Sequence, residues 1–410
     1  MRYSVLVALV LSAASLPAQD PELNSWILNP GNETGYGGYL TNVQTVYYTA
    51  TDVYISCTCI PGYDIGPWAG NPNVPSNQDF TFKLPRNAVE NTGAPTATAL
   101  GHTGVLRNGV SIFNAKDAQS YNNQGIWERN AYFFEGSGFD ECLGHPAPNG
   151  EYHNHVTPNC VYDHLDSEHH SDLIGYAFDG FPIYGAYGYA NTDGTGGIAR
   201  MRSSFRLRSI TDRTTLPDGT VLQANQYGPA INATYPLGAF IQDFEYVEGL
   251  GDLDEHNGRF CVTPEFPEGH YVYFVTLDEN SDPAYPYILG PTYYGTVQAG
   301  NTGPQSGHNT IPNDAVLYDP SATGIAEATP VAADAFSLYP VPVQDVLGIR
   351  TDGTSLSGLR VFDAQGRVVR TEAVTGAQVA VDLSALTAGV YHAQLLFVDG
   401  RTVVRPFVKQ

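Results

Sequence analysis

The sequence has few positive charges. It contains 19 Lys and Arg residues against 42 Asp and Glu residues, which gives a net charge of −23. The segment from residue 336 to the end holds 7 of the basic and 6 of the acidic residues, so the excess negative charge lies before it. An acidic surface repels nucleic acid and anionic membranes. We therefore expect no nucleic-acid partner, and we interpret the charge as a source of solubility or of attraction for cations.

Several sequence motifs and long apolar runs are also missing. The chain has no P-loop, no dinucleotide-type glycine fingerprint, no G-x-S-x-G and no H-E-x-x-H. After the N-terminus no run is long and apolar enough to cross a bilayer. At the N-terminus, Arg2 precedes the short apolar run Val5–Leu11, and Ala18 suits a cleavage site. These features predict a secretory signal peptide over residues 1–18.

The five cysteines fit an exported protein, because export permits disulfides. Cys142 and Cys160 are the preferred pair, since the hairpin expected between them would bring them together. Cys57 and Cys59 are too close in sequence for a relaxed bond to each other. One of these two could reach Cys261, and an odd number leaves at least one thiol unpaired.

The composition and the turn pattern predict a mainly β protein. The chain has 27 Tyr, 43 Gly and 28 Pro residues. The stretch 301–335, rich in small and polar residues, is typical of a linker. Residues 336–410 contain short strands at regular spacing, separated by turn sequences, which predicts a small β-sandwich.

An internal repeat organises the region before the linker. GVLRNGVSIFN at residues 104–114 corresponds to GYAFDGFPIYG at residues 175–185. DECLGHPAPNGEYHNHV at 140–156 corresponds to DEHNGRFCVTPEFPEGHYVYFV at 254–275. The two blocks occur in the same order in both copies, so we predict a pseudo-symmetric β domain over residues 19–300, with copies at about 104–156 and 175–275.

The repeat bears on two histidines that lie two residues apart. It aligns His153 with Val272 and His155 with Phe274. Strand residues two apart share a face, so both histidines are expected to face the interior. Buried imidazoles need a hydrogen-bond partner or a metal ion. His145 lies close enough in sequence to be a third ligand, and the three predict a zinc or copper site.

Further residues could contribute to this site or form others. Cys142 and His256 are possible additional ligands if Cys142 is not oxidised. Glu141 is a weak candidate for a proton acceptor beside the histidines. The loop Asn191–Gly197, NTDGTGG, has some features of a calcium loop but lacks a full ligand set, so an exposed turn is favoured.

The alternative to a metal site is a structural role for the histidines. The imidazoles would then bond to carbonyl and Tyr hydroxyl groups, and the domain would be a surface binding or adhesion module for glycan or protein. An enzyme would need a concave site with an open coordination position. The sequence leaves the choice between enzyme and binding module open.

Two resemblances to known families add to this interpretation. The blocks above, with VYISCTCIPGYDIGPW, resemble the YHYH protein family; its motif stands here as Tyr152-His153-Asn154-His155, with Asn in place of the second Tyr. YPVP, VFDAQGRVV, LSALTAGVYHAQL and RPFVKQ resemble the C-terminal sorting domain of type IX secretion systems. The second resemblance implies handling by that secretion machinery through residues 336–410, and a secreted or cell-surface location. The first implies a domain without a settled activity.

Overall fold

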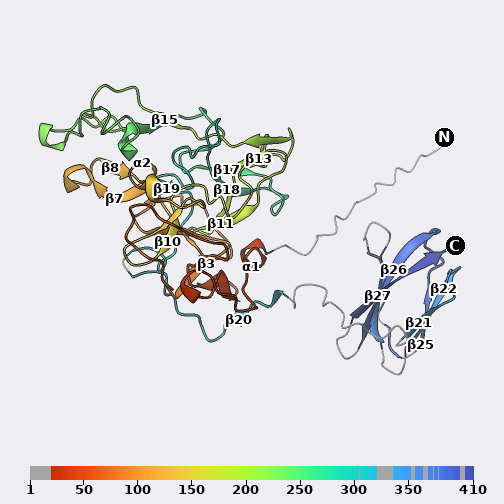
Figure 1. The fold of residues 1–410 in the computed structure, drawn as a ribbon. Coiled ribbons are helices and arrows are strands. Elements are labelled where there is room, and N and C mark those ends of the chain that lie inside the picture. The colour runs from red at the N-terminus through yellow and green to blue at the C-terminus, as the bar shows by residue number, and fades with distance from the viewer. Residues whose placement is uncertain are drawn as a thin grey trace, which may run out of the picture. The chain divides into compact units, whose positions relative to one another are not determined.

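The chain folds into two compact units, the first ending at Tyr318 and the second beginning at Asp319 (Figure 1). This computed structural model describes residues 20–303, 305–320, 336–351, 356–362, 368–372, 374–376, 378–397 and 402–410. The predicted signal peptide, residues 1–18, lies outside the described residues. Both units are mainly β, as the composition predicted. Among the described residues, no helix is both long and apolar enough to cross a bilayer.

An eight-stranded mixed sheet forms the centre of the first unit. Its strands, in spatial order, are β17 (Gly258–Cys261), β18 (His270–Phe274), β12 (Pro182–Tyr184), β11 (Leu173–Ala177), β5 (His102–Leu106), β6 (Ser111–Phe113), β10 (Tyr152–Asn154) and β9 (Gly144–Pro146). Strands β5 and β11 are buried along their whole length. Their sequences, HTGVL and LIGYA, accordingly do not alternate apolar and polar residues, as is typical of a strand covered on both faces.

The pattern of parallel and antiparallel strand pairs in this sheet is the same when read from either edge. The two middle strands, β5 and β11, are antiparallel, and each forms an antiparallel hairpin with the next strand outward. Each hairpin then pairs in parallel with β10 or β18, which pairs antiparallel with the edge strand. The parallel registers also agree: Asn154 pairs with Ile112, and Tyr273 pairs with Ile183.

Two tight turns with the same chemistry connect the central hairpins. Gly109 and Gly180 have φ of 80° and 91°, a region that L-residues avoid. The side chain of the residue before each glycine accepts a hydrogen bond from the main-chain N–H two residues further along the chain. Asn108 Oδ1 accepts from Val110 N at 3.1 Å, and Asp179 Oδ1 accepts from Phe181 N at 3.2 Å. Local turn chemistry thus determines both hairpins.

A second, four-stranded sheet packs on the central sheet. Its order is β20 (Val316–Leu317), β1 (Val43–Tyr48), β2 (Asp52–Cys57) and β3 (Phe80–Pro85). Buried and half-buried residues alternate along β3, the period of a strand with one face in the core. One core cluster joins side chains of this sheet, such as Ile55 and Phe82, to one face of the central sheet. A second cluster covers the other face.

Short elements complete the first unit. They are α1 (Pro21–Asn24), α2 (Ala131–Glu135), β4 (Thr96–Ala97), β7 (Lys116–Ser120), β8 (Glu128–Asn130), β13 (Tyr187–Tyr189), β14 (Ile198–Arg200), β15 (Phe205–Leu207), β16 (Phe244–Tyr246), β19 (Thr292–Tyr293) and the 3₁₀ turns at 36–38, 121–123, 136–138, 224–226 and 241–243. Four two-stranded sheets arise from them: β7–β8, β13–β14, β15–β16 and β4–β19.

The segment expected to be a linker begins inside the first unit. Asn301 is fully buried and its Oδ1 accepts from Lys83 N at 3.0 Å. His308 forms a bridge with Thr81, and β20 pairs with β1. The first unit therefore continues past residue 300, because its backbone groups pair with β1 and β3. Residues 321–335 of the expected linker lie outside the described residues.

The second unit consists of two antiparallel sheets. One has the order β21 (Phe336–Tyr339), β22 (Val346–Thr351), β25 (Gln378–Asp382), and the other β24 (Val368–Glu372), β23 (Leu356–Phe362), β26 (Gly389–Phe397), β27 (Thr402–Lys409). Side chains from both sheets, among them Ile349, Val381, Val361 and Leu395, share one core. The unit has the small sandwich form expected from its regular strand spacing.

Candidate metal centre

Three buried histidines lie together at one edge of the central sheet. His145 is in β9 and pairs directly across from His153 in β10. His155 follows β10 and so shares the face of His153. A turn at Asn149–Gly150, with Gly150 at φ 85°, connects the two strands. The predicted inward orientation of His153 and His155 agrees with their burial.

The ring nitrogens of these histidines converge. One nitrogen from each ring lies within 4.8 Å of the others. The closest approach is 3.0 Å, between Nε2 of His153 and Nε2 of His155. Phe113 stacks on His153 with ring centroids 3.7 Å apart, which fixes the plane of that ring. Three imidazoles at these separations can ligate one ion after small shifts of their side chains.

Main-chain carbonyls determine the tautomers of two of the rings. His153 Nδ1 donates to Glu151 O at 3.0 Å, and His155 Nδ1 donates to Asn114 O at 2.6 Å. In the neutral form each ring then carries its hydrogen on Nδ1. The two Nε2 lone pairs therefore face each other across 3.0 Å, an arrangement that is repulsive unless a proton or a cation lies between them.

Glu135, which the sequence reasoning did not identify, is the carboxylate of the site. Its Oε2 lies 3.3 Å from His155 Nε2 and 3.8 Å from His145 Nε2. Both Glu135 Oε2 and His145 Nε2 are buried without an aligned hydrogen-bond partner. Helix α2 positions this residue, and Asn130 caps the helix by accepting from Tyr132 N at 3.2 Å.

The environment keeps two of the imidazoles neutral. Burial lowers the pKa of His145 to about 4; the neighbouring His155 adds to this effect and Glu135 opposes it. Burial, then His145 and His155, hold the pKa of His153 well below its usual value. For Glu135, burial raises the pKa, but His155, His145 and Arg129 together outweigh burial and lower it. Neutral imidazoles beside an ionised carboxylate are the protonation states that a metal ion requires.

The site is open on one side. A cavity of about 490 Å³ is lined by the three histidines and Glu135, with Phe113, Phe134, Lys116 and Asp117 among its other walls. The histidines thus lie at the edge of a space that could admit a small ligand, which is the concave arrangement expected of a functional site.

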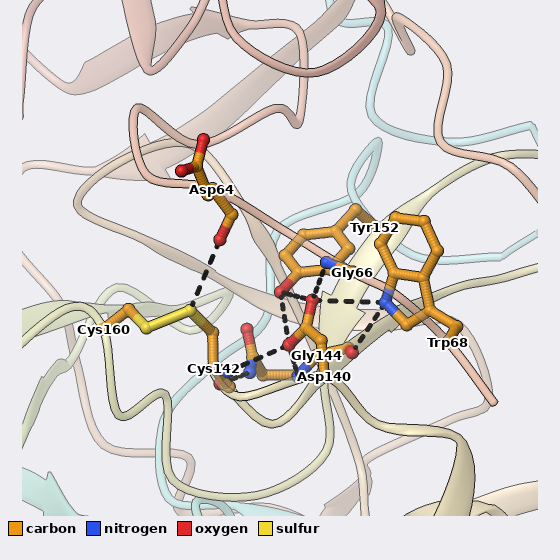
Figure 2. The surroundings of a disulfide bond; sticks show 9 residues. Asp64, Gly66, Trp68, Asp140, Cys142, Gly144, Tyr152 and Cys160 are labelled. Atoms are coloured by element: carbon orange, nitrogen blue, oxygen red, sulfur yellow. Dashed lines mark hydrogen bonds between the residues drawn. A yellow bond between two sulfur atoms is a disulfide. The ribbon is translucent and has the colours of Figure 1, made fainter.

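A hydrogen-bond network around Asp140 holds the strand pair behind the histidines (Figure 2). Asp140 Oδ2 accepts from Tyr152 OH at 2.9 Å, from Gly66 N at 2.8 Å and from Trp68 Nε1 at 3.2 Å. Its Oδ1 accepts from the main chain at Cys142 and Gly144. Because the donors come from the loop at Gly66 and Trp68, from the turn before β9 and from β10, this one carboxylate holds the β9–β10 hairpin against that loop.

The structure decides the roles of the cysteines. Cys142 and Cys160 form the predicted disulfide, with an S–S distance of 2.02 Å (Figure 2). Cys142 is therefore not the additional metal ligand that was considered. The bond that Cys57 or Cys59 could form with Cys261 is not present, because all three are free, buried thiols. Burial raises the pKa of Cys57 to about 12, so this thiol stays protonated.

Two other candidate residues and one candidate loop lie away from the histidines. Glu141 is exposed and does not line the cavity. His256 lies in the turn before β17, with its Nδ1 2.9 Å from Thr292 Oγ1 and 3.1 Å from the Thr292 carbonyl oxygen, so it does not join the cluster. The loop Asn191–Gly197 connects β13 and β14, and its Asp193 carboxylate accepts from Thr195 Oγ1 and Thr195 N. These bonds are those of an exposed turn.

The comparisons with known proteins agree with this arrangement of a β domain followed by a small sandwich. The family model described as YHYH protein matches residues 81–285, half of the chain. The chain belongs to the YHYH protein family. The model described as secretion system C-terminal sorting domain matches residues 337–410. That domain implies export by a type IX secretion system to the cell surface or the medium.

Curated proteins and solved structures assign no activity to this chain. No curated protein gives a significant match. A solved structure of PorZ, described as an essential bacterial surface component of the type IX secretion system of Porphyromonas gingivalis, aligns at 11% identity with a TM-score of 0.16. The alignment covers 94% of this chain and 60% of that chain, so this chain spans about 60% of its length. The TM-score is too low to indicate a shared fold.

Proposed function

We propose that this secreted protein binds one zinc or copper ion through the Nε2 atoms of His145, His153 and His155. The observation that carries the proposal is the 3.0 Å approach of two Nε2 atoms whose partner nitrogens both donate to carbonyls. A cation between the two bare nitrogens turns a repulsive contact into two bonds. Glu135 stands beside the ion and balances part of its charge.

A shared proton is the alternative to a metal ion between His153 and His155. It would place a positive charge in a site where burial lowers the pKa of both His145 and His153. It would also leave His145 Nε2 without a partner, whereas the structural role considered for the histidines requires satisfied rings. Both points favour the metal ion.

The ligand set agrees with zinc or copper, since both accept neutral imidazole. Three imidazoles leave a coordination position toward the 490 Å³ cavity. When bound, such an ion would polarise a small molecule that enters from that cavity. The residues of the chain hold the ion, orient the rings through the carbonyls of Glu151 and Asn114, and exclude water with Phe113.

Metal analysis by mass spectrometry tests this proposal. The exported chain, reconstituted with zinc or with copper, should hold about one ion per molecule. The variant His153→Ala/His155→Ala should hold none while keeping its far-UV circular dichroism. The matched control His164→Ala/His169→Ala removes two histidines outside the cluster and should keep the ion. A folded wild-type chain that takes up neither metal would contradict the proposal.

The carboxylate has a test of its own. Glu135→Gln keeps the shape of the side chain but removes its charge. We expect the affinity for the ion to fall by about 10- to 100-fold, as is usual for groups that support metal ligands. Competition with a chromophoric chelator measures this change. An unchanged affinity would remove Glu135 from the site without affecting the assignment of the histidines.

We also infer that the two halves of the central sheet are copies of one unit. The identical strand order from both edges, the equal registers of β10 and β18, and the two matching turns support this inference. An experimental structure tests it by superposition of residues 104–156 on residues 175–275. Tyr152 should fall on Tyr271, and failure of these residues to coincide would contradict the duplication.

A further inference from the structure

A second polar cluster lies in a different cavity from the histidine site. His102 Nδ1 is 2.9 Å from Glu151 Oε1, and His102 Nε2 is 2.9 Å from Ser306 Oγ. We propose that Ser306 is a nucleophile for acyl transfer, with His102 as its general base and Glu151 as the residue that positions the base. The arrangement has the order of contacts that activates a serine: hydroxyl to imidazole to buried carboxylate.

Three segments far apart in the sequence bring these residues together. His102 is the first residue of β5, and Glu151 immediately precedes β10. Ser306 lies in a loop that follows the strands of the central sheet in the chain. Hydrogen bonds join this loop to β3. Thr81 N donates to Gly307 O at 2.6 Å, and Asn309 N donates to Thr81 O at 3.0 Å. Both bonds are made by residues that follow Ser306 closely, and they hold this segment against the sheet.

The surroundings of His102 favour a fixed and well-oriented base. Phe80, Phe82 and Phe178 surround the imidazole edge to face, with ring centroids 5.2, 5.2 and 5.7 Å away. His102 and Glu151 are both buried. In such a water-poor environment the carboxylate holds the hydrogen on Nδ1 and leaves Nε2 free to accept the hydroxyl hydrogen of Ser306.

Ser306 is accessible from a cavity. The side chain is half-buried, and the residue before it, Gln305, has φ of 59°, which is uncommon for a residue other than glycine. A cavity of about 1000 Å³ is lined by Ser306, His102 and Glu151, and its other walls include Phe80, Leu100 and Phe113. Apolar walls and an acidic protein surface suit a neutral ester with an apolar acyl group.

The proposed reaction with such an ester has two steps. In the first, Ser306 Oγ bonds to the acyl carbon, its proton passes to His102 Nε2, and the bond to the alcohol oxygen breaks as His102 returns that proton to it. In the second, a water oxygen bonds to the acyl carbon, the bond between that carbon and Ser306 Oγ breaks, the water proton passes through His102 to Ser306 Oγ, and the acid leaves. No electrons are transferred, and water is the only co-reactant.

A different assignment of hydrogens in the same cluster would be inert. Ser306 Oγ is also placed to donate its hydrogen to Gly303 O, at 2.6 Å, in place of His102 Nε2. If His102 were charged, it would donate to both Glu151 and Ser306, and the hydroxyl would donate to Gly303 O. The cluster would then only close the loop on β3. Reactivity of Ser306 separates the two assignments.

A fluorophosphonate probe applied to the full chain tests the proposal. We expect one covalent adduct per molecule, located at Ser306 by mass spectrometry of peptides. Ser306→Ala should abolish it, and the control Ser76→Ala, a serine outside the cavity, should not. His102→Gln should lower the labelling rate by about 10⁴-fold. Absence of an adduct on Ser306 of the folded wild-type chain would overturn the proposal.

Two further measurements are needed. The first tests whether Glu151 positions His102 or has only a structural role, and the second tests whether the serine site is independent of the metal site. Glu151→Gln should slow labelling by about 10⁴-fold, and Glu151→Asp should restore part of the rate; equal rates in the two variants would remove the positioning role. Glu151 O also accepts from His153, so labelling is measured with and without chelator. Labelling that survives chelation, and persists in His153→Ala/His155→Ala, would distinguish the serine site from the metal site.

Discussion

The two ends of the central sheet have matching strand pairing and matching Tyr–Asp bonds but carry different side chains on one face. At the β9–β10 end, Tyr152 OH donates to Asp140 Oδ2 at 2.9 Å; at the β17–β18 end, Tyr271 OH donates to Asp254 Oδ2 at 3.0 Å. In both turns the aspartate Oδ1 accepts main-chain bonds two and four residues further on. The turn and the strand pairing are therefore independent of the histidines.

The difference lies in three facing positions. His145, His153 and His155 correspond to Arg259, Val272 and Phe274, and the cross-strand pairs match, His145 with His153 and Arg259 with Val272. Arg259 lies over Phe274 at 5.6 Å from the ring centroid and donates to the carbonyls of Tyr189 and Ala190. One end fills its face by packing and a cation–π contact. The β9–β10 end instead has the Nε2 atoms of His153 and His155 facing each other beside a cavity. This difference makes the β9–β10 end a candidate binding site and the β17–β18 end a packed one.

The largest effect is expected from making the first end resemble the second. His153→Val/His155→Phe should reduce bound metal from about one ion per molecule to none. Without metal, the free energy of unfolding should stay within about 1–3 kcal/mol of that of the metal-free wild type, because two unpaired buried nitrogens are removed while the carbonyls of Glu151 and Asn114 lose their donors. Metal analysis and urea unfolding measure both changes.

The reciprocal substitution is the control for that comparison. Val272→His/Phe274→His places two imidazoles at the second end, but Arg259 occupies the third position with a positive charge. This variant should gain no ion and should be less stable than the wild type. Stoichiometric metal at the second end would show that the Tyr–Asp scaffold alone is enough for a site.

The disulfide is a second difference between the ends. Cys142 is bonded to Cys160 across 18 residues, whereas the corresponding His256 makes no covalent bond. Cys142→Ser should lower the free energy of unfolding by about 3 kcal/mol, because the unfolded chain gains the freedom of an open loop. Urea unfolding measures the loss. A reductant should destabilise the wild type equally and leave this variant unchanged, since the other described cysteines are free.

The hairpin turns differ in charge, which predicts a pH effect from the second half. Burial raises the pKa of Asp179 to about 6, despite bonds from Tyr273, Gly295 and Phe181, whereas Asn108 does not titrate. The native state then holds the proton more tightly than the unfolded state does. The stability gained from this tighter proton binding is present in full below pH 3.8. It is lost as the pH rises through about 6, which lowers the free energy of unfolding by about 3 kcal/mol.

The variant Asp179→Asn isolates this contribution. Unfolding by urea at several pH values between 3.5 and 7 gives the slope of stability against pH. The wild type should lose more stability than the variant as the pH rises through this window. Parallel curves for the two proteins would show that Asp179 does not titrate between them.

The smallest effects are expected where the two ends agree. Tyr152→Phe and Tyr271→Phe each remove a hydroxyl that donates to a buried aspartate. Each should lower the free energy of unfolding by about 1.5–3 kcal/mol, and the two losses should be similar. Thermal or urea unfolding compares them. A loss confined to one end would mean that the two Tyr–Asp bonds contribute unequally to the free energy of unfolding.

Much of the fold follows from local patterns in the sequence. The regular spacing and the turn sequences of residues 336–410 predict short strands, and the structure has them, with β25 at Gln378–Asp382 and β26 at Gly389–Phe397 among them. The spacing of His153 and His155 predicts that they share a buried face. The Cys142–Cys160 bond also follows, because the hairpin between these residues is local.

Contacts between distant segments were not predictable in this way. Glu135 lies at the end of a five-residue helix, ten residues before His145, and no motif relates the two. Likewise, no spacing rule relates Ser306 to His102 and Glu151. The sequence also left open whether Cys57 or Cys59 reaches Cys261, because pairing of remote cysteines depends on how the sheets pack. Cys57 and Cys261 lie on strands of different sheets, and both are free.

The sequence by itself determined which residues turn and which side chains share a face, because a strand repeats every two residues and positive φ requires particular residues. It thereby directed His153 and His155 inward. Only the tertiary structure decided what meets them there: a carboxylate from α2, two carbonyl acceptors and an open cavity. These partners come from separate segments, and their distances depend on the packing of the whole unit rather than on any local pattern.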